Sequence, residues 1–209
     1  MFLVFCKSIE SSSFNFYIFV KIKFVKQLFW QYKLFFIFLL RFFVLYAVLT
    51  IGYRLYLNQF DEKIFEVDGF TKSVAEQTRF ALAFFGKDVA IAPNTFEPCM
   101  NLIYEGKFVD RIIEGCNAVS VMILFAAFVF AFSTKWLKTI GYILIGCLII
   151  HVLNVVRIAL LAVALYHYPE SEHLLHGVVF PLFIYAVVFA LWVLWLQKFS
   201  GYAKHALKK

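Results

Sequence analysis

Three polar side chains in this sequence could together perform covalent chemistry at a carbonyl group: Cys116, Arg157 and His176. A cysteine attacks as its thiolate. A histidine can accept the thiol proton and later deliver it to a leaving amine. An arginine stays cationic and can stabilise the thiolate or the oxyanion of a tetrahedral intermediate. These residue types therefore indicate acyl transfer through a thioester, a chemistry that requires no metal and no cofactor.

The segment around Arg157 carries further polar residues at helical spacing. Asn154 precedes Arg157 by three positions and His151 by six, so the three side chains form one drifting stripe on a helix. Polar groups in an apolar helix are costly and face protein or a wet cavity rather than lipid. We expect Asn154 to orient Arg157 or to line the site.

The surroundings of Cys116 also fit a reactive thiol. It is predicted to lie at a helix N-terminus, where the helix dipole favours an anion. The nearby Glu114 is predicted either to pair with Arg157 or His176 or to end a hairpin in water.

Each of these residues also has a simpler interpretation. Cys116 is then a small buried hydrophobe or the disulfide partner of Cys99. Arg157 extends its charge to the membrane surface, and His176 marks the start of an interfacial helix. The spacing of the histidines matches no strong metal-binding motif.

The elements that must position these residues belong to a membrane protein. Hydrophobic residues make up 63% of the 209 residues and charged residues only 16%, against about 45–50% and 25% in soluble domains. This composition excludes a disordered chain, a water-soluble enzyme and a disulfide-rich secreted scaffold. A helix needs about 20 apolar residues to cross the hydrocarbon core. Four segments meet or approach this length: 34–57, 117–132, 139–166 and 177–196.

The positive charges predict the orientation of these spans. Lysines cluster before the first span, between the second and third, and after the fourth, which places both termini in the cytoplasm. The net charge of +7 is therefore membrane anchoring and not a nucleic-acid signal. Residues 1–33 are predicted to form an interfacial Lys-anchored segment, and residues 198–209 a cytoplasmic basic tail.

The segment 58–115 is acidic, with ten acidic and six basic residues, and is predicted to lie outside the membrane. Asp68 is expected to cap a helix that runs to about Phe85, with Gly86 as its end. Two β-prone runs around Glu105-Gly106 predict a hairpin over 101–113. The predicted fold is an all-α integral membrane protein, a bundle of about four transmembrane helices with a small α+β extracytoplasmic segment between helices 1 and 2.

This topology places the three chemical residues at one depth. Measured from the cytoplasmic end of each helix, Cys116 lies about 24 Å, Arg157 about 27 Å and His176 about 30 Å into the membrane. The predicted catalytic core is thus 116–197, with its site near the outer face.

At these residues the sequence resembles the exosortase/archaeosortase family of membrane transpeptidase-like proteins. The matching blocks are Glu114-Gly115-Cys116-Asn117-Ala118-Val119-Ser120, Asn154-Val155-Val156-Arg157-Ile158, and His176 followed by Phe180-Pro181. The amino-acid sequence around Cys116 and the small size of the chain are most similar to the short F-type subclass. The chain departs from the family in being short and in carrying Asn117 where many relatives have serine, a change that bears on acceptor geometry.

The resemblance implies a cysteine peptidase or transpeptidase of the bacterial inner membrane, with Cys116, Arg157 and His176 as its catalytic residues. Its substrate would be an exported protein with a C-terminal sorting tail, namely a short motif, a transmembrane helix and a basic cluster. The product would pass to an envelope acceptor such as a glycan or a lipid.

Two non-enzymatic functions remain as alternatives. A membrane scaffold or assembly factor would use the acidic segment to hold a partner, and would not need the Cys116 thiol. A small transporter would use His151, Asn154 and Arg157 to line a path, but apolar residues follow His151 toward the cytoplasm.

Overall fold

The computed structural model describes residue 30 and residues 32–60, 64–133 and 135–198. The chain divides into two compact units, residues 1–41 and 42–209. Helix α2 (Lys33–Leu57) begins in the first unit and continues into the second. Most of the predicted segment 1–33, and all of the basic tail except Lys198, lie outside the described residues.

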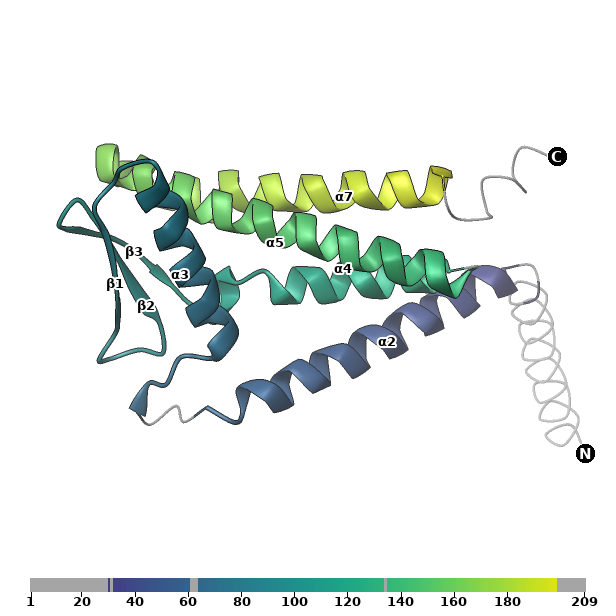
Figure 1. The fold of residues 1–209 in the computed structure, drawn as a ribbon. Helices are drawn as coiled ribbons and strands as arrows, with labels where there is room; N and C mark the ends of the chain where they lie inside the picture. The colour runs from purple at the N-terminus through teal and green to yellow at the C-terminus, as the bar shows by residue number, and fades with distance from the viewer. Residues whose placement is uncertain (1–29, 31, 61–63, 134, 199–209) are drawn as a thin grey trace, which may run out of the picture. The chain divides into compact units, whose positions relative to one another are not determined.

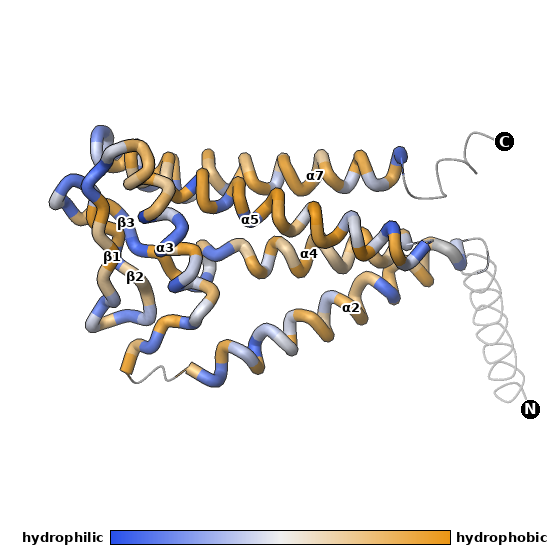
Figure 2. The backbone as a smooth tube through the Cα atoms, in the orientation of Figure 1, coloured by the Kyte–Doolittle hydropathy of each residue, from blue (hydrophilic) through white to orange (hydrophobic). Residues whose placement is uncertain are grey.

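Three described helical segments are long and apolar enough to cross a membrane: Phe35–Leu57, Trp136–His167 and Pro169–Lys198. They correspond to α2, to α5 (Trp136–His167), and to α7 (Phe180–Lys198) with the turns before it. Helix α4 (Val119–Ala131) has 13 residues and spans about 20 Å, less than the 30 Å of a hydrocarbon core. The count of four crossing helices therefore stays a prediction. Figure 2 shows the hydrophobic character of α4, α5 and α7 along their length.

Helices α4, α5 and α7 pack around an apolar core (Figure 1). Phe125, Ile150, Val188 and Trp195 are each at most 3% exposed within it. A Cβ atom on Gly146 would overlap the ring of Phe125. Glycine at this position is what lets α4 approach α5 so closely, as small residues do in membrane bundles.

Helix α3 (Gly69–Phe84) runs across the direction of α5 at one end of these helices (Figure 1). Asp68 begins it by accepting the backbone N–H groups of Phe70 at 3.0 Å and Thr71 at 2.9 Å. The chain leaves it through Gly86 in the left-handed region, with φ of 75°. Both ends thus lie where the cap and stop residues predict them.

A three-stranded antiparallel sheet packs beside α3, in the order β1 (Val89–Pro93), β2 (Met100–Tyr104), β3 (Lys107–Ile112). The turn from β2 to β3 is Glu105-Gly106, both with positive φ, as a tight hairpin turn requires. Strand β1 was not predicted. A second core joins the sheet, α3 and α5, and includes Val74, Leu102, Ile112, Cys116 and Ile158.

A wide helical turn precedes α7. The turn η3 (Pro169–Ser171) and the short helix α6 (Glu172–Leu174) lead into a π-helical turn, η4 (Leu175–Val179). Pro181, the second residue of α7, has no N–H for the carbonyl four residues back. Turns of this kind are frequent at functional sites, and this one contains His176.

Candidate active site

Cys116 lies at the junction of the sheet with α4. It ends a short 3₁₀ turn, η2 (Glu114–Cys116), and is 7% exposed. Helix α4 begins only at Val119, after Ala118 in the left-handed region with φ of 63°. Cys116 is therefore outside the first turn of α4, so the dipole of that helix is not what acts most directly on the thiol.

Arg157 of α5 provides the positive charge at the Cys116 thiol. Burial raises the thiol pKa above its ordinary value, and this effect outweighs the backbone of Ile113 and the charge of Arg157, which both lower the pKa. The neighbouring Asp110 carboxylate raises it. The charge of Arg157 thus favours the thiolate, while burial and the Asp110 carboxylate favour the neutral thiol.

Asn154, one turn before Arg157, fixes the backbone at the cysteine. Its Nδ2 donates to the carbonyl oxygen of Cys116 at 2.7 Å, and the residue is 1% exposed. Among the described residues, Asn154 Oδ1 and Arg157 Nε are buried without a hydrogen-bond partner. The site therefore retains one buried acceptor and one buried donor beside the thiol.

Asp110 on β3 is the site residue that the sequence analysis missed. Its side chain is 10% exposed, and its Oδ2 lies 3.8 Å from His176 Nδ1. The N–H of Arg111 donates to its Oδ1 at 2.8 Å. Burial raises the carboxyl pKa, while the Arg111 backbone and the charges of His176 and Arg157 lower it.

A β-bulge directs Asp110 inward. Leu102 pairs with Asp110 and Ile103 pairs with Phe108, so Val109 is the extra residue on β3. Bulges change the direction in which a strand side chain points. The available signal was strand alternation, which places Asp110 on the same face as the buried Ile112.

His176 reaches this cluster through Asp110. Its side chain is 37% exposed on η4. Among the described residues no hydrogen bond or ion pair joins it directly to Cys116. The structure thus brings Cys116, Asn154 and Arg157 together and links His176 to them by one carboxylate.

Glu114 and Asn117 contact a different set of residues. The Tyr53 hydroxyl hydrogen-bonds with Glu114, in place of the partners Arg157 and His176 that the sequence suggested. Asn117 is buried and its Nδ2 donates to Tyr53 at 2.9 Å and to Thr71 Oγ1 at 3.0 Å. Both residues connect the Cys116 turn to α2 and α3.

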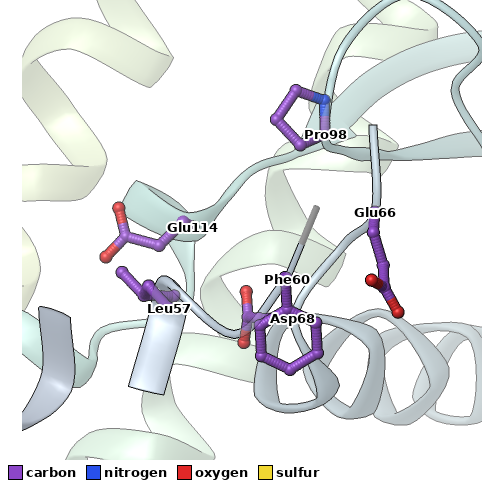
Figure 3. Close-up of a pocket in the computed structure, with 6 residues that line it drawn as sticks. All are labelled: Leu57, Phe60, Glu66, Asp68, Pro98 and Glu114. Atoms are coloured by element: carbon purple, nitrogen blue, oxygen red, sulfur yellow. The ribbon is translucent and has the colours of Figure 1, made fainter. Parts of the chain in front are cut away.

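Glu114 also borders a hollow beside the Cys116 turn. Figure 3 shows its carboxylate together with those of Glu66 and Asp68. Leu57, Phe60 and Pro98 complete the lining. The lining of this hollow thus combines three carboxylates with three apolar side chains.

Two further residues from the sequence analysis lie apart from the reactive cluster. Cys99 and Cys116 are both free and buried, so the alternative of a disulfide between them is not present in the structure. His151 Nε2 lies 2.7 Å from Gln77 Oε1, and its ring packs edge-on against Phe70. His151 therefore belongs to the contact between α3 and α5.

Comparison with protein families gives one match over nearly the whole chain. The family model described as transmembrane exosortase (Exosortase_EpsH) matches residues 6–199. No curated protein and no solved structure gave a significant match.

Proposed function

The chain belongs to the transmembrane exosortase family, and from this we propose that it is a cysteine sorting enzyme with Cys116 as its nucleophile. A sorting role at a membrane is common to the family. The placement of Asn154 and Arg157 of α5 at Cys116 carries the more specific proposal, since Asn154 holds the Cys116 carbonyl and the Arg157 charge acts on the thiol. Burial keeps the pKa of this thiol high, and the neighbouring cation is the group that lowers it toward a reactive thiolate.

The reaction begins when the Cys116 thiol gives its proton to His176 and the resulting thiolate attacks the carbonyl carbon of a scissile peptide bond. A carbon–sulfur bond forms and the oxyanion is stabilised by Arg157. The carbon–nitrogen bond then breaks, and the leaving amine takes a proton from His176. A nucleophile from the acceptor, or water, attacks the thioester, loses its proton to His176 and releases the Cys116 thiolate.

The polar residues around the triad have supporting roles. Asp110 holds His176 and balances the charge of Arg157, while Asn154 fixes the carbonyl of Cys116. Because Asn117 makes hydrogen bonds to Tyr53 and Thr71, its role is to shape the turn that carries the nucleophile.

The substrate in this proposal is an exported protein anchored by a C-terminal transmembrane helix with a basic cluster. The lysines before α2, between α4 and α5, and after α7 support cytoplasmic termini in a bacterial inner membrane. The site then faces outward, where a glycan or lipid acceptor is present. The amino-acid sequence around Cys116 and the length of 209 residues support membership of the short F-type subclass.

Comparative envelope proteomics tests this proposal. Wild type, Cys116→Ala and the matched control Cys147→Ala would be expressed at equal levels in the source organism. We expect a secreted protein to keep its C-terminal tail only in the Cys116→Ala strain. If all tails are unchanged while deletion of the whole protein alters the envelope, Cys116 is a packing residue. The scaffold function then replaces the enzymatic one.

A further inference from the structure

The exposed half of α3 has a charged stripe and beside it, in its C-terminal part, an apolar one, which the polar Ser73 and Gln77 precede on the same side. Lys72, Glu76 and Arg79 follow one another at spacings of four and three residues. Phe80 and Phe84, also four apart, lie beside them and are 69% and 78% exposed. Residues at these spacings share one side of a helix. Phe85, 77% exposed, extends the apolar stripe at its end.

Contacts of α3 with α5 show which way the apolar stripe points. Gln77 is three residues from Phe80 and seven from Phe84, so the three share a side of the helix. Gln77 Oε1 lies 2.7 Å from His151 Nε2. The apolar stripe is thus on the side of α3 that faces along α5 toward His151, and the charged stripe is turned away from it.

The depth of His151 decides what surrounds this stripe. His151 is 15 residues from Trp136, the first residue of α5, or about 22 Å along the helix. A hydrocarbon core is about 30 Å thick. Helix α7 has 19 residues and spans about 28 Å. A bilayer that covers α7 from its cytoplasmic end therefore also extends beyond the level of His151. Tilting of α5 would place His151 farther below the outer surface of the bilayer.

The surface of α5 next to this contact is itself apolar and unpaired. Leu148, Val152 and Val156 repeat every four residues and are 62%, 50% and 44% exposed. On a membrane-crossing helix, this surface is where lipid lies. The apolar stripe of α3 adjoins this part of α5 through the contact of Gln77 with His151.

We propose that α3 is an interfacial helix that lies along the membrane surface with Phe80, Phe84 and Phe85 in the acyl chains of the lipid. Lys72 and Arg79 then point to the headgroups and water, the arrangement expected of an amphipathic helix at an interface. The occupant of the apolar stripe is the bilayer itself. This proposal does not depend on the enzymatic one.

Such an anchor fixes the height of the candidate site relative to the lipid. The buried face of α3 contains Val74 and Thr71, and Thr71 accepts a hydrogen bond from Asn117. Asn117 directly follows the cysteine. A helix held at the interface therefore holds the Cys116 turn there as well, at the level where a single-helix substrate leaves the membrane.

Photocrosslinking in vesicles tests the proposal. Full-length protein carrying benzoylphenylalanine at Phe80 or Phe84 would be reconstituted in phosphatidylcholine and phosphatidylglycerol and irradiated. Lys72 and Glu76 provide matched positions on the charged stripe. We expect several-fold more lipid adduct from positions 80 and 84 than from 72 and 76, measured by mass spectrometry. Cys116 stays intact throughout, and no substrate is required.

Other outcomes would overturn the proposal. Equal lipid yields from both stripes would show that α3 is not oriented on the bilayer. Because benzophenone reacts readily with acyl C–H bonds, an absence of lipid adduct at positions 80 and 84 would place the stripe in water. A protein adduct at position 84 in whole cells, without lipid adduct, would assign the stripe to a protein partner.

Discussion

The two halves of α5 face two different kinds of core. Its first half presents Gly146 and Ile150 to a mostly apolar cluster that includes Phe125 and Trp195. Its second half presents Asn154 and Arg157 to the Cys116 turn and the sheet. In the first core shape decides most of the fit, and the Tyr142 hydroxyl donates to the Leu191 carbonyl at 2.7 Å. In the second, each buried polar group also needs a partner, and two atoms there still lack one among the described residues.

Removing the charge at Arg157 should sharpen this comparison most. Arg157→Gln removes the cation that lowers the Cys116 pKa, so less thiolate exists at neutral pH. It also removes the oxyanion stabiliser, for which losses are about 10²–10³-fold in rate. We expect tail processing to fall by that order and alkylation of Cys116, followed by peptide mass spectrometry, to slow. Unchanged alkylation would mean that Arg157 does not act on the thiol.

The stability of the first half of α5 should depend mainly on side-chain volume. Gly146→Ala places a methyl group against the Phe125 ring, and overpacking of this kind costs about 1–3 kcal/mol. Gly141→Ala on the same helix is the matched control, because nothing lies within 4 Å of its added Cβ. Thermal unfolding in detergent should show a loss for the first variant only. Equal effects would contradict the close approach of α4 to α5.

The polar half should respond to loss of a single hydrogen bond. Asn154→Ala leaves the buried Cys116 carbonyl without its donor, at a cost of about 1–3 kcal/mol. We expect lower unfolding stability and also slower processing, since the turn that holds the thiol loosens. Asn154→Asp keeps the size but removes the donor, and recovery of stability in that variant would count against the bond.

The Asp110→Asn substitution should give the smallest effect of the four. It is also the most specific test, because alkylation of Cys116 and tail processing should change in opposite directions. Its charge raises the Cys116 pKa, so Asp110→Asn lowers that pKa and speeds alkylation at neutral pH. The same change releases His176 without removing it, so processing slows by less than the roughly 10²–10⁴-fold that general acid–base catalysis contributes. The pH profile of alkylation should shift to lower pH. A variant that slows both readouts would be only structurally damaged.

The comparison also separates what the sequence predicts from what it does not. Caps and turns depend on residue types a few positions apart, so Asp68, Gly86 and Glu105-Gly106 mark their elements correctly. The common depth of Cys116 and Arg157 follows from apolar helix lengths, and the two are in contact. These features are local or periodic, which is why single-sequence reasoning finds them.

Other features depend on contacts that the sequence does not display. Strand β1 ends in Pro93 and forms at the sheet edge through its pairing with β2. The left-handed Ala118 delays the start of α4, although alanine seldom adopts this conformation. Alternation with the buried Ile112 gives a signal for Asp110, but the bulge at Val109 interrupts that alternation within β3, and so the carboxylate that joins His176 to the site was not found.

The π-helical turn before α7 makes the position of His176 sensitive to insertions and deletions. A π turn holds one residue more than an α turn, so His176 points toward Asp110 by virtue of a single surplus position. Loss of one residue from Leu175–Val179 would rotate the histidine by about 100°, while α7 keeps its place in the apolar core. A length change of one residue in this turn would therefore be enough to separate His176 from Asp110.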